Sequence, residues 1–169
     1  MTQPLRRAAA GDAPALAALA RRSFSETFGH LYAPDDLAAF LCRHTPEAWA
    51  AEIADPRFAV LVAEAEGKLV AYLKLGPKTL PVEADGSVTE LRQFYVLGPW
   101  QGLGLAPTMM DWALAEARGR GSDCMLLSVF VDNPRAQRFY ARYGFERIGS
   151  YTFMVGSHAD EDHIMRLAL

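Results

Sequence analysis

Residues 89–110 read T-E-L-R-Q-F-Y-V-L-G-P-W-Q-G-L-G-L-A-P-T-M-M, and this stretch decides the fold. The aromatic and β-branched residues in its first third predict a strand, which Gly98 and Pro99 end. Residues 101–106, Q-G-L-G-L-A, then read as a glycine-rich turn that opens a helix. The free N–H groups and positive dipole end of such a helix favour an anion, such as a phosphate. The same pattern also suits a plain strand–helix connection whose glycines allow tight packing.

Composition narrows the class of protein. The length of 169 residues and the hydrophobic fraction of 51% suit a single domain over residues 1–169. A net charge of −3 gives no basic footprint for nucleic acid, and no apolar run reaches the roughly 18 residues of a membrane span. Cys42 and Cys124 form neither a disulfide framework nor a metal-ligand spacing. Since no secretory signal opens the chain and the cysteines form no framework, we expect a cytoplasmic protein. The net charge, the lack of a long apolar run and the lack of a metal-ligand motif predict no nucleic-acid partner, no membrane contact and no metal.

The remaining sequence alternates between helix and strand patterns. Apolar residues at helical spacing predict helices that begin near Asp12, Asp35 and Thr45. Further helices are expected over 105–118 and from 134 to 144, and strands over 5–8, 58–65, 68–75, 124–131, 145–155 and 163–169. The acidic residues 156–162 are expected to form a charged hairpin loop rather than a metal site. This order predicts a mixed α/β fold with helices on both faces of one sheet.

Two motifs stand in order between Glu90 and Phe145. Residues 101–106 fit Q/R-x-x-G-x-G/A, and residues 133–145 fit N-x-x-A-x-x-F-Y-x-x-x-G-F at every named position. The chain thereby resembles the GCN5-related N-acetyltransferases (the GNAT superfamily), and its residues 23–32 and its ending look like the bacterial spermidine/spermine branch. The resemblance implies a central mixed, mostly antiparallel sheet of six to seven strands with a splayed parallel pair. It also implies acetyl-CoA as cosubstrate and, as is common in the family, a homodimer.

The resemblance also implies where acetyl-CoA binds. The strands 90–96 and 124–131 would splay and expose backbone groups, to which the pantetheine amides could bond like an added strand. The diphosphate would then fall on the glycine-rich turn. The expected cosubstrate contacts are Phe94, Tyr95, Val96, Gln101, Gly102, Leu103, Gly104, Leu105, Ala106, Asn133 and Tyr140. Pro107 departs from the family pattern and lacks an N–H, so we expect weaker CoA binding or a phosphate displaced by one amide.

Two residues are the expected catalytic groups. The resemblance places Tyr140 beside the CoA sulfur, where a phenol of pKa ~10 could protonate a leaving thiolate of pKa ~8.5. The alternative for Tyr140 is a place in the core. Glu90 corresponds to a catalytic glutamate of the histone-acetyltransferase members and is the expected base or substrate anchor. Its alternative is an ion pair with Arg92, because residues i and i+2 of a strand share a face.

The acceptor pocket is expected between the first two helices and the last strands. The family resemblance assigns it Phe24, Phe28 and Tyr32, with Tyr151 opposite and Glu90 near the reacting amine. The first candidate substrate is a polyamine or another small alkylamine with a primary amino group. An amino acid, an antibiotic or a protein amine remain alternatives within the class. A non-catalytic acyl-CoA-binding or sensing module is the alternative outside it.

Overall fold

The computed structural model describes residues 4–169, and its seven strands form one sheet in the order β1-β2-β3-β4-β5-β7-β6. The strands are β1 (Leu5–Arg7), β2 (Ala59–Ala65), β3 (Lys68–Gly76), β4 (Val88–Val96), β5 (Cys124–Phe130), β6 (Glu146–Val155) and β7 (His158–Ala168). Every neighbouring pair is antiparallel except β4 and β5, which run parallel. The expected mixed, mostly antiparallel sheet with one parallel pair is confirmed.

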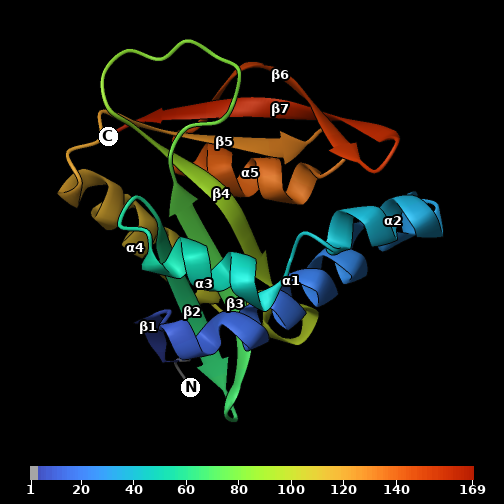
Figure 1. Ribbon diagram of the computed structural model, residues 1–169. Coiled ribbons are helices and arrows are strands. Elements are labelled where there is room, and N and C mark those ends of the chain that lie inside the picture. The colour runs from blue at the N-terminus through green and yellow to red at the C-terminus, as the bar shows by residue number, and fades with distance from the viewer. Residues whose placement is uncertain (1–3) are drawn as a thin grey trace.

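Helices cover both faces of this sheet, as expected. The helices are α1 (Ala13–Phe28), α2 (Pro34–Leu41), α3 (Pro46–Ala54), α4 (Leu105–Gly119) and α5 (Pro134–Arg142). In Figure 1, α1 and α3 cross in front of β2 and β3, and α4 lies behind them. Along β2, Val60 and Val62 pack in one core with α1, whereas Leu61 and Ala63 pack in another core with α4. The alternation of side chains along a strand therefore separates two hydrophobic layers.

Most element boundaries follow the sequence pattern. The residues responsible can be identified at a helix cap and at a hairpin turn. Thr45 caps α3, because its hydroxyl accepts a hydrogen bond from the Ala48 N–H at 3.1 Å. Glu66 and Gly67 close the β2–β3 hairpin with φ angles of 52° and 72°, as a tight two-residue turn requires. Asp12 directly precedes α1, but its side chain makes no capping hydrogen bond to that helix. Its carboxylate instead accepts from the Ala9 N–H and pairs with Arg6.

The expected acidic loop over 156–162 is wrong. Gly156 and Ser157 alone form the turn, and β7 starts at His158 and pairs with β6 from Val155 onward. Asp160 and Asp162 are buried on one face of β7, whereas Glu161 between them is exposed. This alternation is typical of a strand with one buried face. The sequence analysis predicts a loop here because aspartate is depleted in strands, and this segment contains Asp160 and Asp162.

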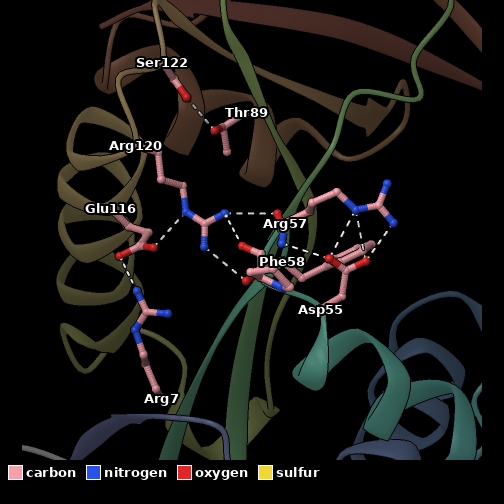
Figure 2. A network of polar contacts seen from close by, with 9 residues as sticks. Arg7, Asp55, Arg57, Phe58, Thr89, Glu116, Arg120 and Ser122 are labelled. Atoms are coloured by element: carbon pink, nitrogen blue, oxygen red, sulfur yellow. Dashed lines mark hydrogen bonds and ion pairs between the residues drawn. The ribbon is translucent and has the colours of Figure 1, made fainter.

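Arg120 ties the end of α4 to the loop before β2 (Figure 2). Its guanidinium donates to Glu116 at 2.8 Å and to the carbonyl oxygens of Arg57 and Phe58 at 3.0 Å each. Glu116 also accepts from Arg7 of β1. Burial tends to raise the pKa of Glu116, but hydrogen bonds from the two arginines hold that pKa below its ordinary value. One cluster thus joins β1, the C-terminal part of α4 and the loop before β2.

None of the helices within residues 4–169 has both the length and the apolar character that crossing a membrane requires.

Candidate functional site

A gap opens between the two parallel strands. Along the described strands, β4 and β5 pair only at Val88–Cys124, Thr89–Met125 and Glu90–Leu126, although β4 continues to Val96 and β5 to Phe130. The two arrows diverge visibly in Figure 1. Backbone groups on the two facing edges therefore lack a strand partner, which is the situation that an extended ligand with amide groups can satisfy.

A bulge in β4 accounts for the divergence. Leu75 of β3 faces Leu91 and Lys74 faces Gln93, so Arg92 is one extra residue on β4. Such an insertion bends a strand and increases its local twist. The bulge comes directly after the last β4–β5 pair, and β4 turns away from β5 at that point.

The glycine-rich turn lies between the end of β4 and the start of α4. Gly102 and Gly104 adopt φ angles of 75° and 85°, which favour glycine. Apart from the glycine and its chain neighbours, no atom of the described residues lies within 4 Å of the position where a Cβ would stand on either residue. The first helical hydrogen bond runs from the Thr108 N–H to the Gly104 carbonyl. The N–H groups of Leu105 and Ala106 therefore have no partner in the helix and suit an anion.

Pro107 fits this arrangement better than its departure from the motif suggests. It is the third residue of α4, before the first N–H that the helix itself uses. Its carbonyl accepts a hydrogen bond from the Tyr143 hydroxyl at 3.2 Å. Tyr143, at the C-terminal end of α5, thus has a structural role and links that helix to the start of α4.

Gln101 links the two walls of the gap. Its Nε2 donates to the Val96 carbonyl at 2.8 Å, and its Oε1 accepts from the guanidinium of Arg135 at the start of α5. Gln101 therefore positions the turn, and the Val96 carbonyl is already bonded. Arg135 was not foreseen from the sequence, although it brings a cation to the edge of the glycine-rich turn.

The end of β5 is held by two amide side chains. Asn133 caps α5, because its Oδ1 accepts from the Ala136 N–H at 3.2 Å. The Nε2 of Gln137 donates to the carbonyls of Phe130 and Val131 at 3.0 and 2.8 Å. Asn133 retains its NH₂ group for a ligand. Gln137 adds a second hydrogen bond to the Phe130 carbonyl, which already accepts from the Asn133 N–H, and one to the Val131 carbonyl.

Tyr140 lies on α5 at the core side of the gap. Its ring packs against Phe139 and Phe145 at centroid distances of 5.5 and 5.8 Å, and Phe139 also meets Phe94 at 6.1 Å. Burial raises the pKa of Tyr140 above its usual value. Burial likewise raises the pKa of Tyr95, and the nearby Tyr140 adds to that rise. The structure therefore brings the two phenols together, and Tyr140 keeps its proton at neutral pH.

Glu90 lies at the closed end of the gap. The residue is 5% exposed, its carboxylate accepts from the N–H groups of Thr79 and Leu80, and Arg92 lies 3.5 Å away. The ion pair that stood as the alternative is present. A base in this position would have to give up these buried hydrogen bonds, which is costly. The assignment of Glu90 as base or substrate anchor stays a prediction without support from the geometry.

The three expected acceptor residues near the first helix do come together. Phe24 lies 5.4 Å from Phe28 and 5.9 Å from Tyr32 between ring centroids, and Phe28 meets Phe130 at the end of β5 at 6.0 Å. These rings form an aromatic wall beside the open end of the gap. Tyr151 packs instead in a small core with residues such as Leu80 and Ile164, so it lines the sheet next to this wall.

Two buried aspartates complete this face, and the sequence reasoning missed both. Asp160 and Asp162 are 8% and 7% exposed. Asp160 accepts hydrogen bonds from Tyr32 and from Nε2 of His158, the latter at 3.1 Å. Burial raises the pKa of Asp162 to about 6; the Asp160 carboxylate adds to this rise, and Ser128 opposes it. The available signal was the alternation of residues 160, 162 and 164, which a strand would place on one face.

The sequence and the fold are both similar to those of known acetyltransferases. Residues 14–145 match the acetyltransferase (GNAT) family. An uncharacterized N-acetyltransferase of Mycobacterium tuberculosis strain H37Rv is 37% identical over 155 residues, which cover 91% of this chain and 96% of that relative.

Solved structures share the fold. A PaiA N-acetyltransferase from Thermoplasma acidophilum in complex with coenzyme A superposes with a TM-score of 0.81 at 21% identity and covers 100% of both chains. The spermidine/spermine N-acetyltransferase from Vibrio cholerae superposes with a TM-score of 0.67 at 22% identity and covers 99% of this chain and 95% of that chain.

The spermidine-type branch is thus one neighbour among several, and identities at this level speak for the fold alone. The extent of the family match, together with the 37% identical relative, shows that this chain belongs to the GNAT family of acetyltransferases.

Proposed function

We propose that this chain moves the acetyl group of acetyl-CoA to a primary amine by direct attack in a ternary complex. The observation that carries the proposal is the gap between β4 and β5. It is flanked by an anion-binding turn with Tyr140 nearby and by the aromatic wall of Phe24 and Phe28. A site for a long phosphorylated thioester thus adjoins a site for a second substrate.

The residues at the gap fit acetyl-CoA. The backbone N–H groups of the turn over residues 102–106 would hold the diphosphate, with Arg135 adding positive charge. The edge of β4 over Phe94, Tyr95 and Val96 would pair with the pantetheine amides through backbone groups other than the Val96 carbonyl, which Gln101 already occupies. The NH₂ group of Asn133 could bond to the same amides from α5.

The chemistry needs a proton donor and an oxyanion donor. When bound, acetyl-CoA supplies a thioester whose carbonyl carbon is open to attack by an amine. Tyr140 gives its proton to the departing sulfur, and a backbone N–H at the end of β4 stabilises the carbonyl oxygen as it gains charge. A covalent relay through cysteine lacks support, because Cys124 is buried in the core and Cys42 is exposed, with only a contact to the Ala39 carbonyl.

The acceptor is proposed to be a small alkylamine, with a polyamine as the first candidate. The aromatic wall and the two buried aspartates suit an apolar chain that carries positive charge. An amino acid, an antibiotic and a protein amine are the competing acceptors. We also propose a cytoplasmic location and, by analogy with the family, a homodimer.

The test is a thiol-release assay with acetyl-CoA and a panel of amines. The panel contains butylamine, putrescine, spermidine, free amino acids, an aminoglycoside and a lysine-containing peptide. We expect thiol release that depends on one class of amine, with saturation in both substrates. CoA binding by calorimetry, without thiol release above background for any amine, would instead identify an acyl-CoA-binding module.

A further inference from the structure

Asp162 lies beside the open end of the gap. On β7 it faces Phe130, the last residue of β5, and on the other side it faces Tyr151 of β6. Directly paired residues of antiparallel strands project to the same face, so the carboxylate stands in a row between two aromatic side chains. Tyr95 approaches from β4, close enough that the charge of Asp162 contributes to its raised pKa.

The groups that surround Asp162 include another carboxylate, and no cation forms an ion pair with it within residues 4–169. Its neighbours are the carboxylate of Asp160, the phenols of Tyr32 and Tyr95, and the Ser128 hydroxyl. Asp160 is already engaged by Tyr32 and His158.

A carboxylate that is 7% exposed and lacks a cation is costly for a folded protein. Structural carboxylates in this chain avoid that cost: Glu90 bonds to two N–H groups, and Glu116 to two arginines. Asp162 differs from both, because the hydroxyl of Ser128 is its hydrogen-bond partner and no cation pairs with it within residues 4–169. It lies beside the open end of the gap, where the second substrate would approach. The missing cation is therefore expected from the substrate.

We propose that Asp162 holds the ammonium group of the acceptor amine and takes its proton, in the role that the motif resemblance implies for Glu90. The inference rests on the proposed acetyl transfer. It restricts the acceptor to amines that arrive positively charged, with an apolar portion that lies against Phe28 and Phe130.

The proton account is complete with these residues. The ammonium gives one proton to Asp162, which passes it to solvent. The neutral nitrogen attacks the thioester carbonyl carbon, a C–N bond forms, and the C–S bond breaks with its electron pair on sulfur. Sulfur takes a proton from Tyr140, and the second proton lost by nitrogen returns through water to the Tyr140 phenolate. One proton in total reaches the solvent, and an amide and a free thiol are formed.

The experiment compares the full-length chain with D162N, D162E and E161Q. Glu161 is the matched control, because it is a carboxylate on the same strand, exposed and on the opposite face. Thiol release is followed between about pH 5 and pH 9 with butylamine, putrescine and spermidine, and CoA affinity is measured by calorimetry.

We expect D162N to lose about 10²–10⁴-fold in kcat, as is typical when a general base is removed, and to lose the acidic limb of the native profile near pH 6. D162E should restore part of the rate, E161Q should match the native chain, and CoA affinity should stay unchanged in all three. A D162N variant with native kcat and an unchanged pH profile overturns the proposal. A rise in KM alone overturns the role in proton transfer.

A second measurement separates this proposal from the proposed reaction. Spermidine is titrated into the CoA complex of the native chain and of D162N, without acetyl-CoA. Binding that weakens as the pH falls below about 6 in the native chain, and that is absent in D162N, supports the ammonium site even if no amine is acetylated. Equal binding to both chains counts against it. Absent turnover of the native chain with every amine counts against the reaction alone.

Discussion

Replacing Asp162 by asparagine should make the folded chain more stable at neutral pH while it removes activity. Burial holds the pKa of Asp162 at about 6, against an ordinary value of 3.8. Below pH 3.8 the carboxyl is protonated in both the folded and the unfolded chain. As the pH rises, the unfolded chain ionises first, so the folded chain loses stability until the pH passes about 6.

The magnitude follows from the difference between the two pKa values. A gap of about 2.2 at 1.36 kcal/mol per pKa unit corresponds to about 3 kcal/mol of lost stability above pH 6. Asparagine has nearly the same shape and carries no charge, so D162N should recover most of this free energy. For a chain of this length, 3 kcal/mol raises the melting temperature by about 6–12 °C.

The assay is thermal unfolding of the native chain, D162N and E161Q by circular dichroism near pH 8 and near pH 4. D162N should melt above the native chain near pH 8, and this advantage should shrink near pH 4, where the native Asp162 is largely protonated. E161Q should follow the native chain at both values. If D162N melts lower near pH 8, the ionised carboxylate has a stabilising partner and the reasoning on its missing cation fails.

Three further substitutions test the other assignments. Tyr140→Phe should lower kcat for thiol release by about 10²-fold or more with unchanged CoA affinity, because it removes the proton donor; unchanged turnover would return Tyr140 to the core. Glu90→Gln should lower the free energy of unfolding in urea by about 1–3 kcal/mol, since the N–H groups of Thr79 and Leu80 lose a charged acceptor. A loss of kcat with native stability would restore Glu90 as a base. Arg120→Ala should cost about 1–3 kcal/mol in the same urea measurement, with native kcat, because it breaks a partly buried set of hydrogen bonds that holds α4; an unchanged urea midpoint would show that the cluster in Figure 2 contributes little.

The parts of the site that depend on local sequence could be predicted. The turn over residues 101–106 is set by two glycines at positive φ and by a helix that starts directly after them. The cap at Asn133 is also a local device, since its partner is three residues away. Patterns of this kind are readable because the residues that interact are neighbours in the chain.

The parts that depend on distant pairing could not be predicted. The environment of Glu90 is made by the loop at Thr79 and Leu80, eleven and ten residues away, whose position no spacing rule fixes. The bulge at Arg92 is visible only in the register between β3 and β4. Asp162 faces the site because β7 starts at His158 and pairs with both β5 and β6. A one-residue change in that register would turn its side chain to the other face.

The two catalytic candidates stand on opposite faces of one sheet, and this explains why the gap is needed. Tyr140 and Met165 both pack in the core on the α4 side of the sheet. Asp162 is three residues before Met165 on β7, so its side chain points to the opposite face, which α1 covers. In a continuous sheet the backbone would separate a proton donor from a proton acceptor. Where β4 leaves β5, both faces reach one opening, and Tyr95 lies within the electrostatic influence of each residue.

Two features that lower the stability of the ligand-free chain lie at this opening. Strand edges without partners and a buried carboxylate without a cation both cost stability. The proposed substrates would relieve both, the cosubstrate through its amides and the amine through its charge. The cosubstrate would bind to the edges of β4 and β5, and the amine to Asp162 at the same gap. We therefore expect each substrate to bind more tightly when the other is present, because each would restrict the motion of one side of the gap. Calorimetric titration of CoA with and without spermidine should therefore give a lower Kd in its presence, and an equal Kd would show that the two walls act independently.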